Sequence, residues 1–257
     1  MTDRASLEVA GVTKRFGAHC AVDDVSFRVR PGTITGLIGP NGAGKTTMFN
    51  LIAGALQPSA GRISLGERRL DGARPHRVLH AGVARTFQIP RPFAAMTVLE
   101  NVMLAARDQP GERVWTSWLR PGIVAASERA VRERARELLD FVGLGAMIGA
   151  PARTLSGGQR KLLELARALM TSPRVLLLDE PAAGVTPSLV NAIAERIVAL
   201  HERGVTILLI EHNLDFVMRL CRPVLVMASG RLLLEAEPDT VRADPRVIEA
   251  YLGGPAR

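Results

Sequence analysis

The sequence predicts an α/β protein whose mostly parallel sheet is preceded by an N-terminal antiparallel β part and interrupted by a helical sub-lobe. Apolar runs of strand length alternate with helical periodicity over much of the chain, which is typical of parallel sheets covered by helices. The middle of the chain shows helical periodicity only. We therefore expect a single domain over residues 1–257, with a core at 1–90 and 160–257 and a helical sub-lobe at about 91–159.

The first ninety residues predict the antiparallel part and the first buried strand. The stretches that start at Leu7 and Val22 read as two strands with a Gly-containing connection, and a Pro-Gly pair ends the second. "TITGLIG" from Thr33 is almost continuously apolar, as in a strand buried on both faces. The other elements expected here are a helix from Lys45 to near Gly54 and strands at 61–65 and 83–88.

The rest of the chain becomes helical and then returns to alternation. Helical periodicity is present at 97–107 and 127–143, and the insert between these segments holds Trp115 and Trp118, to which we assign no role. A further helix with an apolar stripe starts at the Ser-Gly-Gly turn near 156. Three apolar strands are then expected within 174–181, 205–212 and 223–230, with helices between them.

The composition fits a packed domain. Hydrophobic residues make up 47% and charged residues 23% of the 257 positions, which is enough for a core. Cys20 and Cys221 form no ligand-like cluster, so we expect reduced thiols in a cytosolic protein. No apolar run approaches the roughly 20 residues of a membrane span, and the N-terminus, with Asp3, lacks the apolar segment of a secretory signal.

The formal net charge of +8 raises the question of a nucleic-acid partner. All but three of the 33 Lys and Arg residues are arginines, and they are scattered without a block of five or six. An Ala- and Arg-rich composition produces the same balance. We therefore expect no nucleic-acid partner.

The stretch "GPNGAGKTT" predicts a phosphate loop, because it matches G-x-x-x-x-G-K-[ST] between an expected strand and an expected helix. Glycines let successive backbone N–H groups point at phosphate oxygens. Lys45 is a compact charge suited to reach the β- and γ-phosphates, and the Thr46 hydroxyl is a suitable ligand for Mg²⁺. The nucleotide-binding residues expected in this loop are Gly39, Asn41, Gly42, Ala43, Gly44, Lys45, Thr46 and Thr47.

The stretch "VLLLDEP" predicts the acidic half of the same site. Asp179 stands at the polar end of a buried apolar strand, where it can hold Mg²⁺ through water. Glu180 faces the other way if the strand alternation continues, so we expect it to orient and deprotonate the attacking water. Acidic pairs often simply end a strand, but the phosphate loop elsewhere in the chain favours catalysis.

A second glycine-rich helix start is "LSGGQ" at residues 155–159, here called the LSGGQ segment. A helix that begins on small residues offers free backbone N–H groups and the positive end of its dipole, which together attract anions. The residues alone do not explain why one chain has two such sites.

Taken in order, "GPNGAGKTT", Gln88, "LSGGQ", "LLLDEP" and "EH" at 211–212 resemble the nucleotide-binding subunit of an ABC transporter over nearly the whole chain. The resemblance implies ATP and Mg²⁺ as cofactors and a head-to-tail dimer. In that dimer the LSGGQ segment of each subunit covers the γ-phosphate held by the other, which explains the two sites. The residues implied to contact the partner's ATP are Ser156, Gly157, Gly158 and Gln159.

The resemblance also implies roles for single residues. Phe16 matches the aromatic that stacks on adenine, although by itself it could equally belong to the core. Gln88 matches the glutamine that senses Mg²⁺ and the attacking water, and His212 matches the histidine that contacts the γ-phosphate and partners Glu180. One departure is Thr186, which stands where the family usually has Asp and so concerns communication between subunits.

Longer stretches, "GVARTFQIPRPFAAMTVLENVMLAAR", "EPAAGVTP" and "VIEAYLGG", resemble the ATPase subunits of branched-chain amino acid importers. This resemblance implies a peripheral ATPase at the cytoplasmic face of the inner membrane. The implied partners are two membrane permease subunits, a second ATPase that is either a paralogue or an identical copy, and, indirectly, an extracytoplasmic binding protein. The residues do not separate branched-chain amino acids from related amino acids or small polar solutes.

Two alternatives stay open at the level of sequence. The first is the ATPase of a lipopolysaccharide-extraction ABC exporter, which shares the general plan. The second is a soluble ABC ATPase without membrane partners. Chromosome-structure members carry long coiled coils between the phosphate loop and the LSGGQ segment, and translation-type members usually carry two cassettes, and this chain has neither feature.

Overall fold

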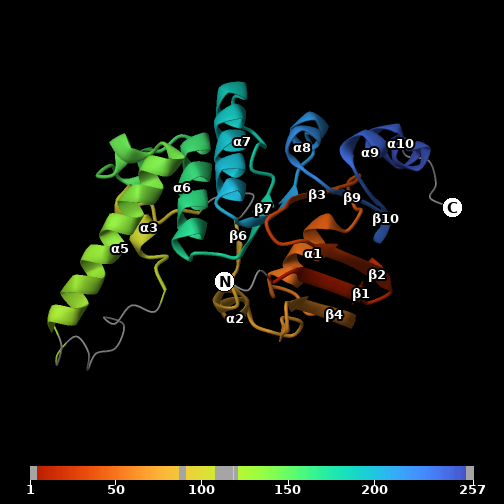
Figure 1. The fold of residues 1–257 in the computed structure, drawn as a ribbon, viewed down its shortest axis with the longest axis horizontal. Helices are drawn as coiled ribbons and strands as arrows, with labels where there is room; N and C mark the ends of the chain where they lie inside the picture. Colours follow the sequence, from red (N-terminus) through yellow and green to blue (C-terminus); the bar gives the residue numbers. More distant parts are fainter. Residues whose placement is uncertain (1–4, 87–90, 108–117, 119–120, 253–257) are drawn as a thin grey trace. The chain divides into compact units, whose positions relative to one another are not determined.

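The computed structural model describes residues 5–86, 91–107, 118 and 121–252, and the chain forms two compact units. The first unit contains Met1–Gln88, Arg174–Ala183 and Val190–Arg257, and the second contains Ile89–Pro173 and Gly184–Leu189. The second unit therefore extends beyond the boundary predicted at 159 and includes the whole helix that follows Ser156. Figure 1 shows the elements of both units in chain order.

A four-stranded antiparallel sheet in the first unit has the order β2-β1-β4-β5. β1 pairs antiparallel with β2 and with β4, which confirms the antiparallel start expected from the sequence. Its strands are β1 (Leu7–Phe16), β2 (His19–Val29), β4 (Ala60–Leu65) and β5 (Arg68–Arg69).

A six-stranded sheet forms the other layer, in the order β10-β9-β3-β8-β7-β6. All neighbours are parallel except β9 and β10, which confirms the predicted fold class. Every residue of β3, β7 and β8 is buried, as their continuous apolar sequences predict. The strands are β3 (Ile34–Ile38), β6 (Val83–Arg85), β7 (Val175–Asp179), β8 (Thr206–Ile210), β9 (Val224–Ala228) and β10 (Arg231–Ala236).

Helix α1 (Lys45–Ile52) joins the two sheets of the first unit. Its buried residues Met48, Phe49, Leu51 and Ile52 share one hydrophobic core with side chains from β1 and from β7, β8 and β9. This packing fixes the helix, and therefore the loop that precedes it, at the carboxyl end of β3. The other helices with residues in this unit are α2 (Pro75–His80), α7 (Pro187–Glu202), α8 (Leu214–Leu220), α9 (Pro238–Ala243) and α10 (Pro245–Leu252).

Several short elements are not predicted by the sequence pattern. They are β5, β10, α2, α9 and α10, which contain between two and eight residues each. A segment of this length holds too few turns or alternations for its periodicity to be recognised. Helices this short also depend on tertiary packing for their stability.

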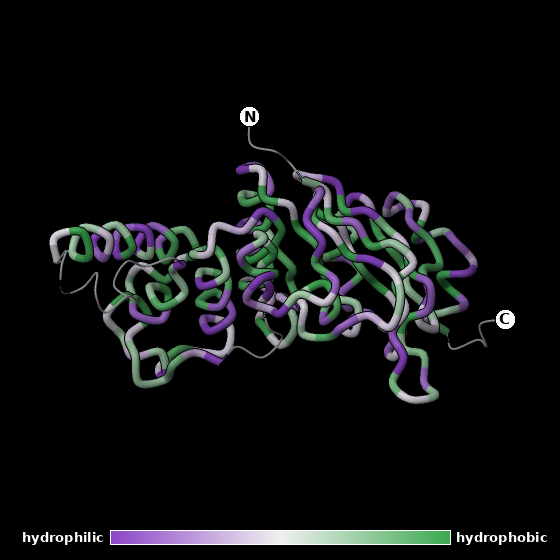
Figure 2. Tube along the Cα trace, turned by 90° about the horizontal axis from the view of Figure 1, so that it is seen from below, coloured by the Kyte–Doolittle hydropathy of each residue, from purple (hydrophilic) through white to green (hydrophobic). Residues whose placement is uncertain are grey.

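The second unit is helical. Its main helices, α3 (Val98–Met103), α5 (Pro121–Val142) and α6 (Gly157–Met170), contact one another, and two 3₁₀ helices occupy Gly145–Met147 and Ala152–Thr154. Hydrophilic and hydrophobic residues alternate around the turns of α5 (Figure 2), whose buried face includes Leu138 and Leu139. The helical nature of this segment confirms the expectation from its periodicity.

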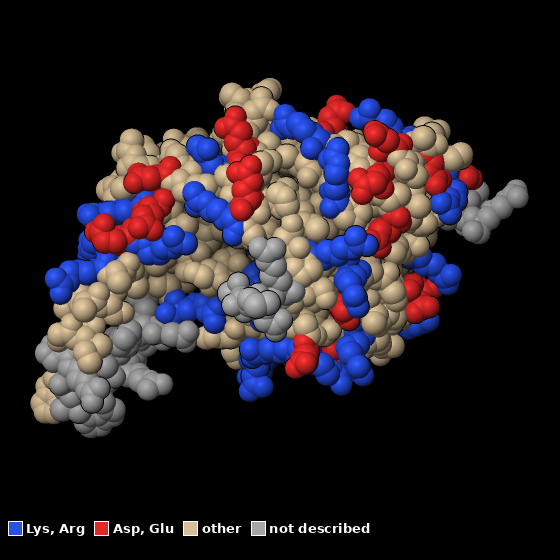
Figure 3. Space-filling view, viewed as in Figure 1, with Lys and Arg blue, Asp and Glu red and all other residues tan. Residues whose placement is uncertain are grey.

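The surface is mixed in charge, and the described helices are not membrane spans. On the face seen in Figure 3, Lys and Arg side chains lie among Asp and Glu side chains, as the scattered sequence positions predict. Within the described ranges, no helix combines the length and the apolar character that crossing a membrane requires.

Candidate nucleotide site

The phosphate loop, residues 39–47, lies between β3 and α1. Gly39, Gly42 and Gly44 have φ angles of 148°, 79° and 97°, which side-chain-bearing residues rarely adopt. A Cβ on Gly39 would lie 2.0 Å from the carbonyl oxygen of Met227, and one on Gly44 would lie 2.5 Å from that of Ala21. Both positions therefore require glycine, and the loop is held closely against the chain around it.

Lys45 places a buried positive charge in this loop. Lys45 is 6% exposed, and its Nζ donates hydrogen bonds to the carbonyl oxygens of Gly39 at 2.7 Å and Pro40 at 2.9 Å. Burial lowers the pKa of Lys45, and the carboxylate of Glu180 opposes that shift. The N-cap residue of α1 is Gly44, which has no side chain, so the first-turn N–H groups are open to an anion.

Asp179, the last residue of β7, is held by β6. The Nη2 of Arg85 donates to Asp179 Oδ2 at 2.6 Å, and its Nη1 donates to Asn50 Oδ1 at 2.6 Å. The Asp179 N–H donates to the hydroxyl of Thr86 at 3.4 Å. The carboxylate is thereby oriented through one oxygen while the other stays available for a metal ion or water.

Arg85 is a site residue that the sequence reasoning missed. It lies on β6, which pairs in parallel with β7, and its backbone is in register with Leu177. The available signal was a basic residue in "ARTFQ" at the end of a strand, because neighbouring parallel strands end at the same edge of the sheet. Its side chain is 11% exposed, so it forms a largely buried ion pair with Asp179.

Glu180 leaves the strand rather than continuing it. β7 ends at Asp179, and Glu180 has a φ of 48°, so the expectation from strand alternation does not apply and a turn sets its direction. The left-handed conformation costs a residue with a side chain roughly 1–2 kcal/mol. The N–H of Glu180 donates to the carbonyl of Ile210 at 2.9 Å, which ties the turn to β8.

The structure brings Glu180 and His212 together. The Nε2 of His212 lies 2.9 Å from Oε1 of Glu180, and their side chains are 47% and 13% exposed. Glu180 directly follows β7 and His212 lies two residues after the end of β8, and these two strands are parallel neighbours. The contact therefore follows from both strands ending at one edge of the sheet.

Glu211 is a second residue whose role the sequence reasoning missed. Its buried carboxylate accepts hydrogen bonds from the N–H groups of Ala182 at 2.6 Å and His212 at 3.1 Å. Burial raises the pKa of Glu211, and these backbone hydrogen bonds oppose the shift. Glu211 thus fastens the turn after Glu180 to the segment that carries His212. Its only signal in the sequence was its place in the "EH" pair.

Of the two further residues implied by the resemblance, the structure describes Phe16 but not Gln88. Phe16 ends β1 and is 47% exposed, with Nζ of Lys14 located 5.1 Å from its ring centroid. This exposure rules out the core alternative and leaves ring surface for a stacking partner. Gln88 lies outside the described residues, as does Trp115, while Trp118 is 79% exposed.

The LSGGQ segment begins α6 in the second unit. The hydroxyl of Ser156 accepts from the N–H of Gln159 at 3.2 Å, and Oε1 of Gln159 accepts from the N–H of Ser156 at 2.9 Å. This is a capping box, so these two side chains already serve their own helix. A Cβ on Gly158 would lie 2.0 Å from Leu189 Cδ2. Ser156 and Gly157 are exposed at the surface.

The residues at the first site fit Mg²⁺ bound together with a nucleotide. Among the described residues, no group of three or more His, Cys, Asp or Glu side chains forms a metal cage. Mg²⁺ usually takes only one or two protein ligands and completes its shell with water and phosphate oxygens. One oxygen of Asp179 and the exposed Thr46 hydroxyl supply donors of this kind.

Comparison with protein families gives two matches. The family model described as "ABC transporter" matches residues 22–183, and the model described as "Branched-chain amino acid ATP-binding cassette transporter" matches residues 231–257. The chain is 40% identical over 251 residues to the high-affinity branched-chain amino acid transport ATP-binding protein BraF of Pseudomonas aeruginosa, covering 97% of this chain and 98% of that protein. It is 38% identical over 248 residues to LivG of Escherichia coli K12, with 96% and 97% covered.

The similar solved structures are also ATP-binding cassettes of ABC transporters. A nucleotide-free ATP-binding cassette from an ABC transporter is similar with a TM-score of 0.83 at 38% identity, over 97% of this chain and 99% of that one. An ATP-binding cassette of an ABC transporter in its ADP conformation is similar with a TM-score of 0.81 at 36% identity, with the same coverage.

Proposed function

The chain belongs to the ABC transporter family of ATP-binding cassettes, and from this membership we propose that it is the ATP-hydrolysing subunit of an importer for branched-chain amino acids. The observation that carries the catalytic part is the 2.9 Å contact between Glu180 and His212, in the same compact unit as the buried ammonium of Lys45. A general base beside a phosphate-binding cation suits hydrolysis of a nucleoside triphosphate.

In the proposed reaction, Lys45 and the N–H groups of the phosphate loop bind the β- and γ-phosphates. Glu180 takes a proton from the attacking water as the water oxygen bonds to the γ-phosphorus and the bond from that phosphorus to the bridging oxygen breaks. His212 orients Glu180 and contacts the γ-phosphate. Mg²⁺, held by Thr46 and Asp179 with Gln88 as a further contact, would neutralise charge on the phosphate oxygens. The exposed ring of Phe16 stacks on the adenine.

The LSGGQ segment acts on a second subunit. Ser156 and Gly157 are exposed and lie at the positive end of α6, which suits contact with a phosphate carried by another chain. We infer a head-to-tail dimer in which each subunit covers the other's ATP. The second ATPase is either a paralogue or an identical copy.

The importer assignment is supported by the family match at the C-terminal end and by the relatives. The relatives compared above are named as branched-chain amino acid transport ATP-binding proteins, and residues 231–257 match a model of the same description. These findings favour the importer over the lipopolysaccharide exporter and over a soluble ATPase. The implied partners are two permeases and, through them, a binding protein, with this chain on the cytoplasmic face of the inner membrane.

The proposed assembly can be tested by isolating it. The tagged chain is recovered from host membranes in mild detergent, and the co-purifying proteins are identified by mass spectrometry. We expect two polytopic permeases and a second ATPase. Lipopolysaccharide-bridging proteins, or no membrane protein at all, would overturn the importer assignment.

A further inference from the structure

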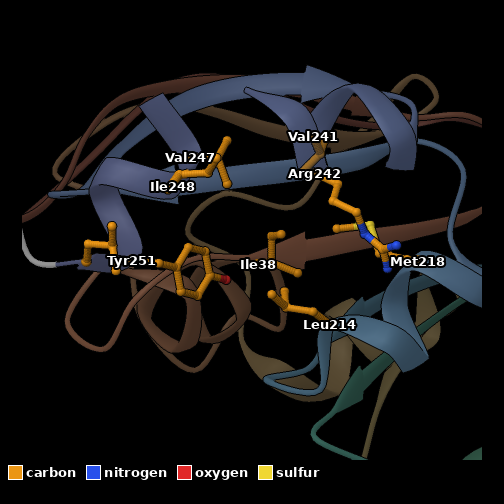
Figure 4. Close-up of a pocket in the computed structure, with 9 residues that line it drawn as sticks. Ile38, Leu214, Met218, Val241, Arg242, Val247, Ile248 and Tyr251 are labelled. Atoms are coloured by element: carbon orange, nitrogen blue, oxygen red, sulfur yellow. The ribbon is translucent and has the colours of Figure 1, made fainter. Parts of the chain in front are cut away.

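A pocket of about 230 Å³, here called the α10 pocket, lies where α8, α9 and α10 meet the end of β3. All of its lining residues belong to the first unit. The lining side chains are apolar or aromatic with one exception, Arg242 of α9. Figure 4 shows the ring of Tyr251 and the side chains of Ile38 and Leu214 close together, with the guanidinium of Arg242 beside Met218. None of the roles proposed above uses this pocket.

The apolar side chains around the α10 pocket are open to solvent. Leu214, Ile248, Tyr251 and Leu252 all line the pocket, and all four are exposed in the described part of the chain. Single exposed apolar side chains are ordinary, but several of them around one cavity are typical of a binding site. The α10 pocket therefore suits a ligand with an apolar part.

The size of the α10 pocket limits that apolar part. An apolar cavity of about 150 Å³ holds one benzene molecule. A pocket of about 230 Å³ therefore has room for an aliphatic group of about four carbon atoms. A stable protein partner would instead need a much broader interface than one small pocket.

The rim of the α10 pocket carries one positive and one negative charge. Nη2 of Arg242 donates to Oδ1 of Asp215, the neighbour of Leu214, at 3.5 Å. The two side chains are 66% and 93% exposed, so this ion pair contributes little to the stability of the fold. A guanidinium has five N–H donors, so Arg242 keeps donors for a ligand. A cation and an anion side by side complement a ligand that carries both charges.

We propose that the α10 pocket binds an aliphatic amino acid. The guanidinium of Arg242 donates hydrogen bonds to its α-carboxylate, and the carboxylate of Asp215 accepts from its α-ammonium. Its aliphatic side chain fills the cavity beside Ile38 and Leu214. The choice of leucine within this class rests on the proposed function, because an importer of branched-chain amino acids releases them on the side of the membrane where its ATPase lies.

The first test follows leucine binding through Tyr251, which lines the pocket and is the only tyrosine of the chain. The full chain is labelled with ¹³C-tyrosine, and its single ring signal is followed by NMR during titration with leucine. We expect the signal to shift and to saturate. Alanine lacks three of the carbon atoms that leucine would bury, so it should bind roughly 50-fold more weakly. A signal that leucine does not shift would overturn the proposal.

Two analogues test the charges of the ligand. Isocaproate is leucine without its ammonium, and isoamylamine is leucine without its carboxylate. Each loses one ion pair at the exposed rim, so each should bind about fivefold more weakly than leucine. Isocaproate that binds as tightly as leucine would overturn the amino acid assignment and indicate an apolar carboxylate instead.

The second test uses variants that change the rim and the cavity. Arg242→Gln should weaken leucine binding about fivefold. Arg222→Gln is its control, because Arg222 and Glu237 form another ion pair with exposed side chains, at 61% and 65%, and neither residue lines the pocket. Ile248→Trp should fill the cavity and abolish binding, whereas Val198→Trp, at an exposed apolar position of α7, should not. Parent affinity in Ile248→Trp would overturn the proposal.

The result is separable from the proposed function, because leucine binding is measured on this chain alone. A chain that co-purifies with permeases but binds no leucine would overturn the α10 site and keep the importer. A chain that binds leucine but recovers no permease would keep this site and overturn the importer.

Discussion

Helices α1 and α6 both begin on glycine-rich turns, yet their N-termini are built in different ways. The start of α1 is capped by Gly44, which has no side chain, and a buried Lys45 ammonium follows it. The start of α6 is capped by the reciprocal hydrogen bonds of Ser156 and Gln159, and its first residues are exposed. The N-terminus of α1 has no capping side chain and lies beside a buried cation, whereas the N-terminus of α6 is stabilised by its own side-chain cap.

This difference explains how one chain can use two similar turns. An N-terminus with no capping side chain and a buried cation attracts an anion strongly, so it suits the nucleotide that the subunit itself holds. A capped and exposed N-terminus keeps its helix stable while no partner is present. In the proposed dimer, such an N-terminus suits a phosphate that the other subunit brings and removes during each cycle.

The largest effect is expected from Glu180→Gln, which tests whether the chemistry belongs to the unit that contains α1. Loss of the general base should slow ATP turnover about 10²-fold to 10⁴-fold, while nucleotide binding is retained. Steady-state turnover and nucleotide titration measure the two quantities. Glu195→Gln, at an exposed position of α7, should leave both unchanged. Hydrolysis at the parent rate would show that Glu180 is not the base.

Arg85→Gln tests whether the ion pair with Arg85 holds Asp179 in the site. The Arg85–Asp179 pair is largely buried, with side chains 11% and 5% exposed, so removing the cation should lower the free energy of unfolding by about 3–5 kcal/mol. Arg28→Gln is the control, because Arg28 pairs with Glu8 at 63% and 38% exposure and should lose about 1 kcal/mol or less. Denaturant unfolding measures both. Equal losses would mean that Arg85 does not hold Asp179.

Lys45→Ala removes the buried ammonium at the start of α1. Hydrogen bonds to charged groups contribute about 1.5–3 kcal/mol, so ATP affinity should fall roughly tenfold to 100-fold. Calorimetric titration with ATP measures the change. Lys161→Ala, which removes a lysine from α6 instead, should keep the parent affinity. If the Lys45→Ala protein bound ATP with the parent affinity, the buried ammonium would not be what makes the start of α1 a nucleotide site.

Ser156→Asp sharpens the comparison by separating the cap from the contact with a partner's phosphate. Asp caps a helix about as well as Ser, so the unfolding temperature should stay near that of the parent. Its negative charge would face a phosphate in the dimer, so ATP turnover should fall by at least about tenfold. Ser156→Asn caps equally without the charge and should remain the more active of the two. Equal turnover of Ser156→Asp and the parent would argue against contact with phosphate.

Much of the architecture was predictable because its signals are local. The buried strands β3, β7 and β8 appear in the sequence as continuous apolar runs, and the phosphate loop appears as a motif between a strand and a helix. The short elements near the C-terminal end were not predictable in this way. Helix α10 in particular has only eight residues, about two turns, which is too short for its periodicity to stand out in the sequence.

The residues of the candidate site also differ in whether a local sequence pattern indicates them. Residue types and spacing along the chain were enough to propose Lys45, Asp179 and Glu180 as site residues, because these groups stand within motifs or at the ends of buried strands. The residues that support them could not be identified in this way, because Arg85 reaches Asp179 from 94 positions away and Glu211 reaches the backbone of Ala182 from 29 positions away. Long-range contacts of this kind arise when strands and helices pack, and no local pattern records which side chains will then meet.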